Sequence, residues 1–193
     1  SSVPVVFTAV TDPVAAKLVK DAKPSGTNVT GVSDRLPLAP QIDLMQKIVP
    51  GAKRIGMVYS PGEVNSTIIV KELKEALAQR GMSLHEAAAP RTVDIPSAAK
   101  SLIGKIDLMY TTTDNNVVSA YESMARLAAD AKLPLVASDT GSVARGAIAA
   151  LGMNYYDMGR QTGKIVVRIL KGEKPGAIAF EVGRNTTLEI NAK

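Results

Sequence analysis

Polar residues of the kind that hold small charged ligands follow several apolar runs in this chain. Asp12, Asp114 and Asp139 each come shortly after such a run. A carboxylate at Asp114 or Asp139 could hold an ammonium group, and hydroxyl or N–H groups at a helix start, such as Thr11 or Ser66, could hold a carboxylate. These residues therefore suit a small ligand that carries both charges, such as an amino acid.

These clusters contain more donors and acceptors than helix capping needs. Taken singly, each Asp is explained as a helix N-cap, because Asp is a preferred capping residue. The clusters recur with polar partners, however, and small ligands are commonly fixed by a few such groups in an otherwise apolar crevice. The candidate ligand-binding residues are Thr11, Asp12, Ser60, Asn65, Ser66, Asp114, Asn115 and Asp139.

Strand-like and helix-like segments alternate along the chain, which predicts parallel βαβ units in an α/β fold. Because parallel strands end at one common edge, we expect the polar clusters to face one gap. The predicted strands are 3–10, 28–32, 54–59, 82–88, 106–112, 134–138 and 147–151, with weaker strand-like pieces in 178–190. The predicted helices are 13–22, 40–49, 63–80, 94–103, 115–131 and 155–170.

Composition narrows the possible classes of protein. The chain has 193 residues, 46% of them hydrophobic, and a net charge of +5 from scattered Lys and Arg. Scattered basic residues indicate a solvated surface rather than a nucleic-acid interface. The absence of cysteine excludes disulfides and thiolate chemistry. Because Ser1 stands almost directly before a predicted strand, we expect further residues upstream.

Enzyme signatures are not met. The segment 141–146 has the glycine spacing of a phosphate loop, but Ala147 and Ile148 stand where lysine and a hydroxyl are required. The single histidine, His85, lies in a predicted strand and cannot furnish a typical zinc site without cysteines. We therefore expect no catalytic residues, no metal and no cofactor.

Several segments together resemble the solute-binding proteins of bacterial ABC importers, in the family that includes tryptophan and tyrosine binders. The resemblance covers essentially the whole chain. It implies a type I periplasmic-binding-protein fold, in which two α/β lobes trap a ligand between them. The segments are 5–13, 28–32, 56–59 with Asn65-Ser66, 110–115, 154–161 and 169–175.

The resemblance also implies a domain division. Residues 1–34 and 150–176 would form a partial first lobe whose N-terminal part is missing, and residues 35–149 and 177–193 would form a near-complete second lobe. Thr11 and Asp12 would lie at the cleft edge of the first lobe, and the other six candidates at that of the second. Apolar faces left uncovered in the first lobe should promote a homodimer.

The leading functional hypothesis is a non-enzymatic binding component that passes a small solute to a membrane permease. The solute would be an amino acid, because sugar binders of this architecture tend to stack rings on Trp or Phe and this chain has no Trp and only Phe7 and Phe180. An aromatic amino acid is the more specific candidate, since the family that the chain resembles includes tryptophan and tyrosine binders. The resemblance implies a periplasmic or extracellular membrane-associated location. The scattered basic residues predict no nucleic-acid partner. One alternative is the ligand-sensing domain of a transcription regulator with the same fold, and another is a doubly wound α/β enzyme.

Overall fold

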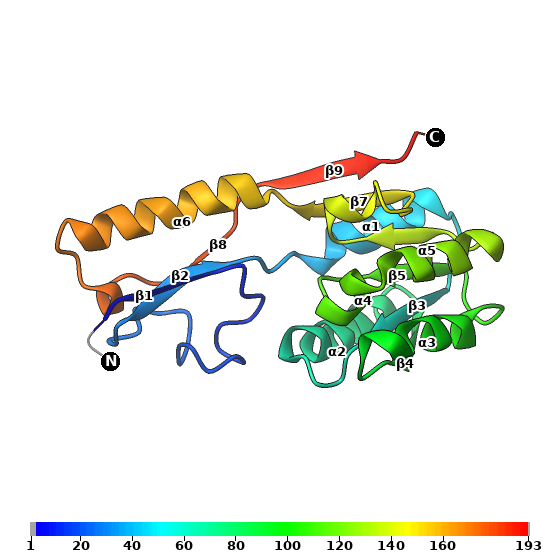
Figure 1. The fold of residues 1–193 in the computed structure, drawn as a ribbon, viewed down its shortest axis with the longest axis horizontal. Coiled ribbons are helices and arrows are strands. Elements are labelled where there is room, and N and C mark those ends of the chain that lie inside the picture. Colours follow the sequence, from blue (N-terminus) through cyan, green and yellow to red (C-terminus); the bar gives the residue numbers. More distant parts are fainter. Residues whose placement is uncertain (1–2, 193) are drawn as a thin grey trace. The chain divides into compact units, whose positions relative to one another are not determined.

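The computed structural model describes residues 3–192, which form two compact units (Figure 1). Unit 1 contains residues 3–36 and 153–186, and unit 2 contains residues 37–152 and 187–192. The predicted boundaries at 34–35 and 149–150 lie within a few residues of these. The third differs by ten residues, because residues 177–186 include a strand, β8 (Glu181–Val182), that pairs with a strand of unit 1.

Unit 2 is built on a six-stranded sheet. Its strand order is β4-β3-β5-β6-β7-β9, and the pairings β4·β3, β3·β5, β5·β6 and β6·β7 are parallel, as the alternation of strands and helices predicts. The strands are β3 (Arg54–Tyr59), β4 (Ser83–Ala88), β5 (Leu108–Thr111), β6 (Leu135–Ala137), β7 (Ala149–Met153) and β9 (Thr186–Ile190).

Helices cover both faces of this sheet, because alternate residues of each central strand are apolar on opposite sides. On β5, Leu108 and Tyr110 pack with α1 and α2, whereas Met109 packs with the cluster that α3, α4 and α5 form. The result is a three-layer α/β/α unit. The helices are α1 (Leu38–Ile48), α2 (Val64–Ala78), α3 (Ile95–Leu102), α4 (Asn115–Ser119) and α5 (Tyr121–Asp130).

Unit 1 is a smaller parallel sheet packed against one long helix. Its strand order is β1 (Val5–Thr8), β2 (Val29–Ser33) and β8. The helix is α6 (Tyr155–Leu170), with bounds that match the predicted 155–170. Its buried residues Met158 and Ile165 pack with Val32 and Ile178, and this cluster is the core of the unit.

Two predicted helices differ from the structure. Residues 13–22 form turns rather than a helix: Asp12 caps a single turn, and Lys17 then takes a left-handed backbone conformation with φ of 59°. A right-handed helix needs φ of about −63°, so it cannot continue through a residue in this conformation. The predicted helix 115–131 is interrupted at Ala120, which separates α4 from α5.

Gly31 is a position in unit 1 that leaves no room for a side chain. It lies opposite Phe7 in the β1·β2 register, and a Cβ atom there would stand 2.1 Å from the Phe7 carbonyl oxygen and 2.6 Å from its ring. Since backbone atoms cannot move aside cheaply, Gly31→Ala should lower the free energy of unfolding by about 1–3 kcal/mol, as overpacking does.

Chemical denaturation would measure this effect against a matched glycine variant. Gly159 lies in α6 with open space around its Cα, so Gly159→Ala should leave stability unchanged or raise it by about 0.5–1 kcal/mol. Equal unfolding midpoints for the two variants would contradict the close packing of Phe7 on Gly31.

Candidate ligand-binding site

A buried carboxylate joins the loops that follow two strands of unit 2. Asp114, which follows β5, is fully buried and is the N-cap of α4. Its Oδ2 accepts hydrogen bonds from the Ser60 N–H and the Ser66 hydroxyl, both at 2.6 Å. Its Oδ1 accepts from the Ser60 hydroxyl at 2.8 Å and the Val117 N–H at 3.0 Å. Asp114 thereby ties the end of β3 and the first turn of α2 to the end of β5.

Four donors fill the hydrogen-bonding capacity of this carboxylate, since an ionised carboxyl group has about four lone-pair sites. Three of the donors come from Ser60 and Ser66, which lie 54 and 48 residues away in sequence. The sequence analysis predicts an ammonium ligand for Asp114 or Asp139, whereas the partners of Asp114 in the structure belong to its own unit. Asp114 is therefore positioned to stabilise the loops that follow β3 and β5.

A second set of contacts lies beside this carboxylate. Glu63 Oε2 accepts hydrogen bonds from the Asn115 N–H at 3.1 Å, the Asn115 side-chain amide at 2.8 Å and the Asn65 side-chain amide at 3.2 Å. Asn116 donates to the Ser60 hydroxyl and accepts from Thr92. The candidates Ser60, Asn65, Ser66, Asp114 and Asn115 are thus brought together at the carboxyl ends of β3 and β5.

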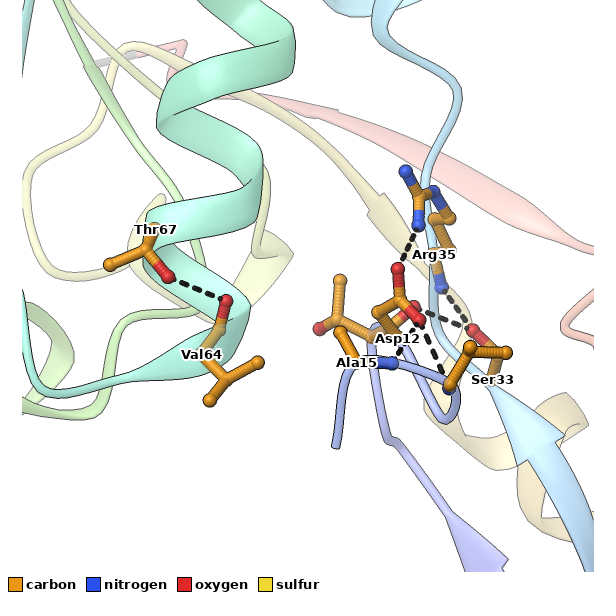
Figure 2. Close-up of polar contacts among 8 residues, drawn as sticks. Asp12, Ala15, Ser33, Arg35, Val64 and Thr67 are labelled. Atoms are coloured by element: carbon orange, nitrogen blue, oxygen red, sulfur yellow. Dashed lines mark hydrogen bonds and ion pairs between the residues drawn. The ribbon is translucent and has the colours of Figure 1, made fainter. Parts of the chain in front are cut away.

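Hydrogen bonds within the first turn also order the start of α2. The Thr67 hydroxyl donates to the Val64 carbonyl oxygen at 3.1 Å within the first helical turn (Figure 2). The N–H of Thr67 donates to the Glu63 carbonyl oxygen at 3.0 Å. This turn carries Asn65 and Ser66, so its regular backbone fixes the Cα positions of these two residues.

Asp139 follows β6 and bonds within its own turn. Its Oδ2 accepts from the Ser142 hydroxyl at 3.1 Å and its Oδ1 from the Gly141 N–H at 3.4 Å. The glycine-spaced segment 141–146 therefore begins in a short 3₁₀ turn, Thr140–Ser142, that Asp139 caps. The contacts of Asp139 are those of a helix cap, and they do not make a phosphate-binding loop of the segment 141–146.

In unit 1, Thr11 and Asp12 lie in the loop after β1 and contact the segment after β2. The Ser33 hydroxyl donates to the Thr11 carbonyl oxygen at 3.0 Å, and the Arg35 guanidinium pairs with Asp12 at 2.8 Å (Figure 2). Asp12 also accepts from the Val14 and Ala15 N–H groups at 3.0 and 2.9 Å. Burial alone would raise the pKa of Asp12, but the hydrogen bond from Ala15 and the pairing with Arg35 outweigh it and hold this pKa below its ordinary value.

Two buried polar groups near these loops were not among the candidates. Asp34 and Thr112 are each 8% exposed, and Asp34 Oδ1 and Thr112 Oγ1 have no hydrogen-bond partner in the described part of the chain. Thr112 follows the last residue of β5, and Asp34 follows the last residue of β2. The available signal is this position at a strand end. Thr112, however, falls within the predicted strand 106–112, and Asp34 falls at the predicted boundary between the lobes.

Unit 1 also contains a separate pocket of about 300 Å³ between α6 and the segment after β8. Its two acidic side chains accept hydrogen bonds from other lining residues: Glu181 accepts from Gln161 and Arg184, and Asp157 accepts from Asn185. The pocket is lined by Asp157, Arg160, Gln161, Lys164, Glu181, Arg184 and Asn185.

Residues 3–192 contain no group of three or more His, Cys, Asp or Glu side chains arranged to bind a metal ion. His85 is half-buried in β4 and lies 3.4 Å from the Ser83 hydroxyl. Over the same residues, no helix is long and apolar enough to cross a membrane.

Parallel strands that present polar loops at their carboxyl ends are typical of periplasmic-binding-protein folds, and sequence comparison identifies the family. The model of the ABC transporter substrate-binding protein family matches residues 1–193, and the chain belongs to this family. The predicted family and fold class are confirmed.

Three relatives each match almost the whole of this chain. A tyrosine-binding protein of Clostridioides difficile (strain R20291) is 36% identical over 189 residues, which is 98% of this chain and 55% of that protein. A conserved domain protein of Vibrio cholerae has 44% identity and a TM-score of 0.93, with 97% of this chain and 63% of that one covered. The ABC domain of Streptococcus pneumonia in complex with L-Trp has 35% identity and a TM-score of 0.90, with 97% and 65% covered. The chain thus spans between about half and two thirds of the length of these relatives.

Removing the charge of Asp114 should destabilise unit 2. In Asp114→Asn, one carboxylate oxygen becomes an NH₂ group that faces either the Ser60 N–H and the Ser66 hydroxyl or the Ser60 hydroxyl and the Val117 N–H. Two buried donors lose their acceptor in either case, and one of them is a backbone N–H that cannot turn to accept instead. We expect a loss of about 2–4 kcal/mol in the free energy of unfolding, since each buried unsatisfied group costs about 1–3 kcal/mol.

Asp130→Asn is the matched control, because Asp130 is exposed at the end of α5. It should change stability by no more than about 0.5 kcal/mol. Urea unfolding followed by circular dichroism measures both variants. A midpoint for Asp114→Asn equal to that of the control would contradict the structural role of this carboxylate.

Proposed function

We propose that this chain carries the ligand-binding loops of an extracytoplasmic component of an ABC importer that binds an amino acid, with an aromatic one as the first candidate. The family match over the whole chain supports the transport role. The ligand class is supported by the tyrosine-binding relative and by the relative solved with L-Trp. The component would bind its ligand without transforming it and deliver it to a membrane permease.

We propose that both units contribute residues to the site. Thr11 and Asp12 would contribute from unit 1, and Ser60, Asn65, Ser66, Asn115 and Asp139 from unit 2. Asp114 would act by positioning, because its acceptor sites are taken up by donors of its own chain. The feature that carries this proposal is the contact set that converges on Asp114, since it holds neighbouring polar loops ready for a ligand before the ligand arrives.

The first test is thermal-shift screening of the natural full-length protein against the twenty amino acids, with glucose and arabinose as negative controls. A ligand present at about 100 times its dissociation constant stabilises the folded state by about 2.7 kcal/mol, so a specific amino acid should raise the melting temperature clearly. L-tyrosine or L-tryptophan should give the largest shift. A shift with a sugar and none with an amino acid would overturn the proposed ligand class.

A variant in the first turn of α2 tests the site itself. Asn65→Ala should weaken binding of the identified amino acid about tenfold, which is the loss of one hydrogen bond to a charged group. Gln79→Ala is the control, because Gln79 is exposed at the opposite end of the same helix. Isothermal titration calorimetry measures both, and equal dissociation constants would remove Asn65 from the site.

We also propose that the 193-residue chain self-associates through β1. Among the described residues β1 lies at one end of its three-stranded sheet. Val5, its first residue, is 43% exposed, and Val3, just before it, is 65% exposed. Unpaired apolar edge strands recruit other strands, and a lysine on the edge blocks this. Sedimentation velocity should show a dimer that Val5→Lys dissociates and Val93→Lys, in unit 2, does not. A monomer at high concentration would contradict this interface.

A further inference from the structure

Asp34 is a buried carboxylate whose hydrogen bonds are incomplete. It lies at the carboxyl end of β2, directly after Ser33, and is 8% exposed. Its Oδ2 accepts one hydrogen bond, from the Tyr155 hydroxyl at 3.3 Å, and its Oδ1 is buried with no partner among the described residues. Buried charged groups in proteins are normally paired, so this one requires an explanation.

The other aspartates beside the strand ends do not share this property. Asp114 has four donors, and Asp12 has Arg35 together with two backbone N–H groups. Burial of a carboxylate is tolerated when donors replace the lost water. Of these three, Asp34 alone has a carboxylate oxygen that no donor of the described residues reaches.

The backbone on both sides of Asp34 is fixed. The Ser33 hydroxyl donates to the Thr11 carbonyl oxygen and accepts from the Arg35 N–H at 3.1 Å. The side chain of Arg35, the adjacent cation in sequence, pairs with Asp12 (Figure 2). Asp34 is therefore held beside the Thr11–Asp12 loop, while the terminal torsion of its carboxyl group stays soft enough to turn toward a donor.

We propose that Asp34 accepts the ammonium group of the bound amino acid and that the Tyr155 hydroxyl orients the carboxylate for this contact. An ammonium group is a compact cation with three N–H donors, which matches a buried carboxylate that has an unfilled acceptor. The inference rests on the proposed function. It assigns recognition of the positive end of the ligand to unit 1 and to a residue outside the eight candidates.

The test compares Asp34→Asn with the natural full-length protein, using L-tyrosine and L-tryptophan as probes. Affinity should fall about 100-fold, in the range expected for a lost charge-assisted hydrogen bond. The melting temperature of the ligand-free variant should stay the same or rise, because an amide carries no uncompensated charge. A purely structural Asp34 would give the opposite change in melting temperature. Asp130→Asn, at an exposed site, should leave affinity and melting temperature unchanged.

A ligand series keeps the inference testable if Asp34→Asn does not fold. The unaltered protein should bind 3-(indol-3-yl)propionate, which lacks the ammonium group, far more weakly than L-tryptophan. Where Asp34→Asn does fold, the same two ligands should bind to the variant within a few-fold of each other.

The outcomes separate the two proposals. If the unaltered protein binds no amino acid, the proposed function fails and this inference falls with it. If it binds an amino acid and Asp34→Asn binds equally well, or if the deaminated ligand binds as tightly as L-tryptophan, the function stands and the role of Asp34 is overturned.

Discussion

The arrangement of the polar loops in unit 2 depends on one buried carboxylate. Asp114 accepts hydrogen bonds from the loop after β3, from α2 and from the first turn of α4. Two segments about fifty residues apart therefore share a single acceptor group. In a buried environment such bonds are strong, and leaving them unmade is costly. The loops therefore have a defined shape that the sheet alone would not impose, because a sheet fixes where strands end but not how the following residues turn.

Much of the fold follows from periodicity. The bounds of β3 and α6 agree with the predicted 54–59 and 155–170, because a buried parallel strand and an amphipathic helix leave strong and different patterns. The predicted helix 13–22 is wrong, because a capped Asp-Pro start indicates where a helix can begin and not that it continues. The left-handed conformation of Lys17 depends on local backbone contacts that residue types do not encode.

The candidate site was predictable in its location and less so in its roles. Strand ends identified Ser60, Ser66 and Asp114 as neighbours, and the structure brings them together. The sequence could not show that the two serines use up the acceptor sites of Asp114, because those contacts span about fifty residues and depend on the exact turn of each loop. For the same reason Asp34 was overlooked, since an unfilled acceptor is a property of packing and not of residue type.

The loop between Ser60 and Ser66 has a further consequence for how such proteins diversify. Both ends are fastened to the same buried group, while Pro61, Gly62 and Val64 between them face solvent. Substitutions at these three positions change the surface of the loop without removing the hydrogen bonds of Ser60 and Ser66 to Asp114. The residues that maintain the fold are thus separate from those that can vary. Related proteins can therefore evolve a different ligand preference while the backbone of this loop stays the same.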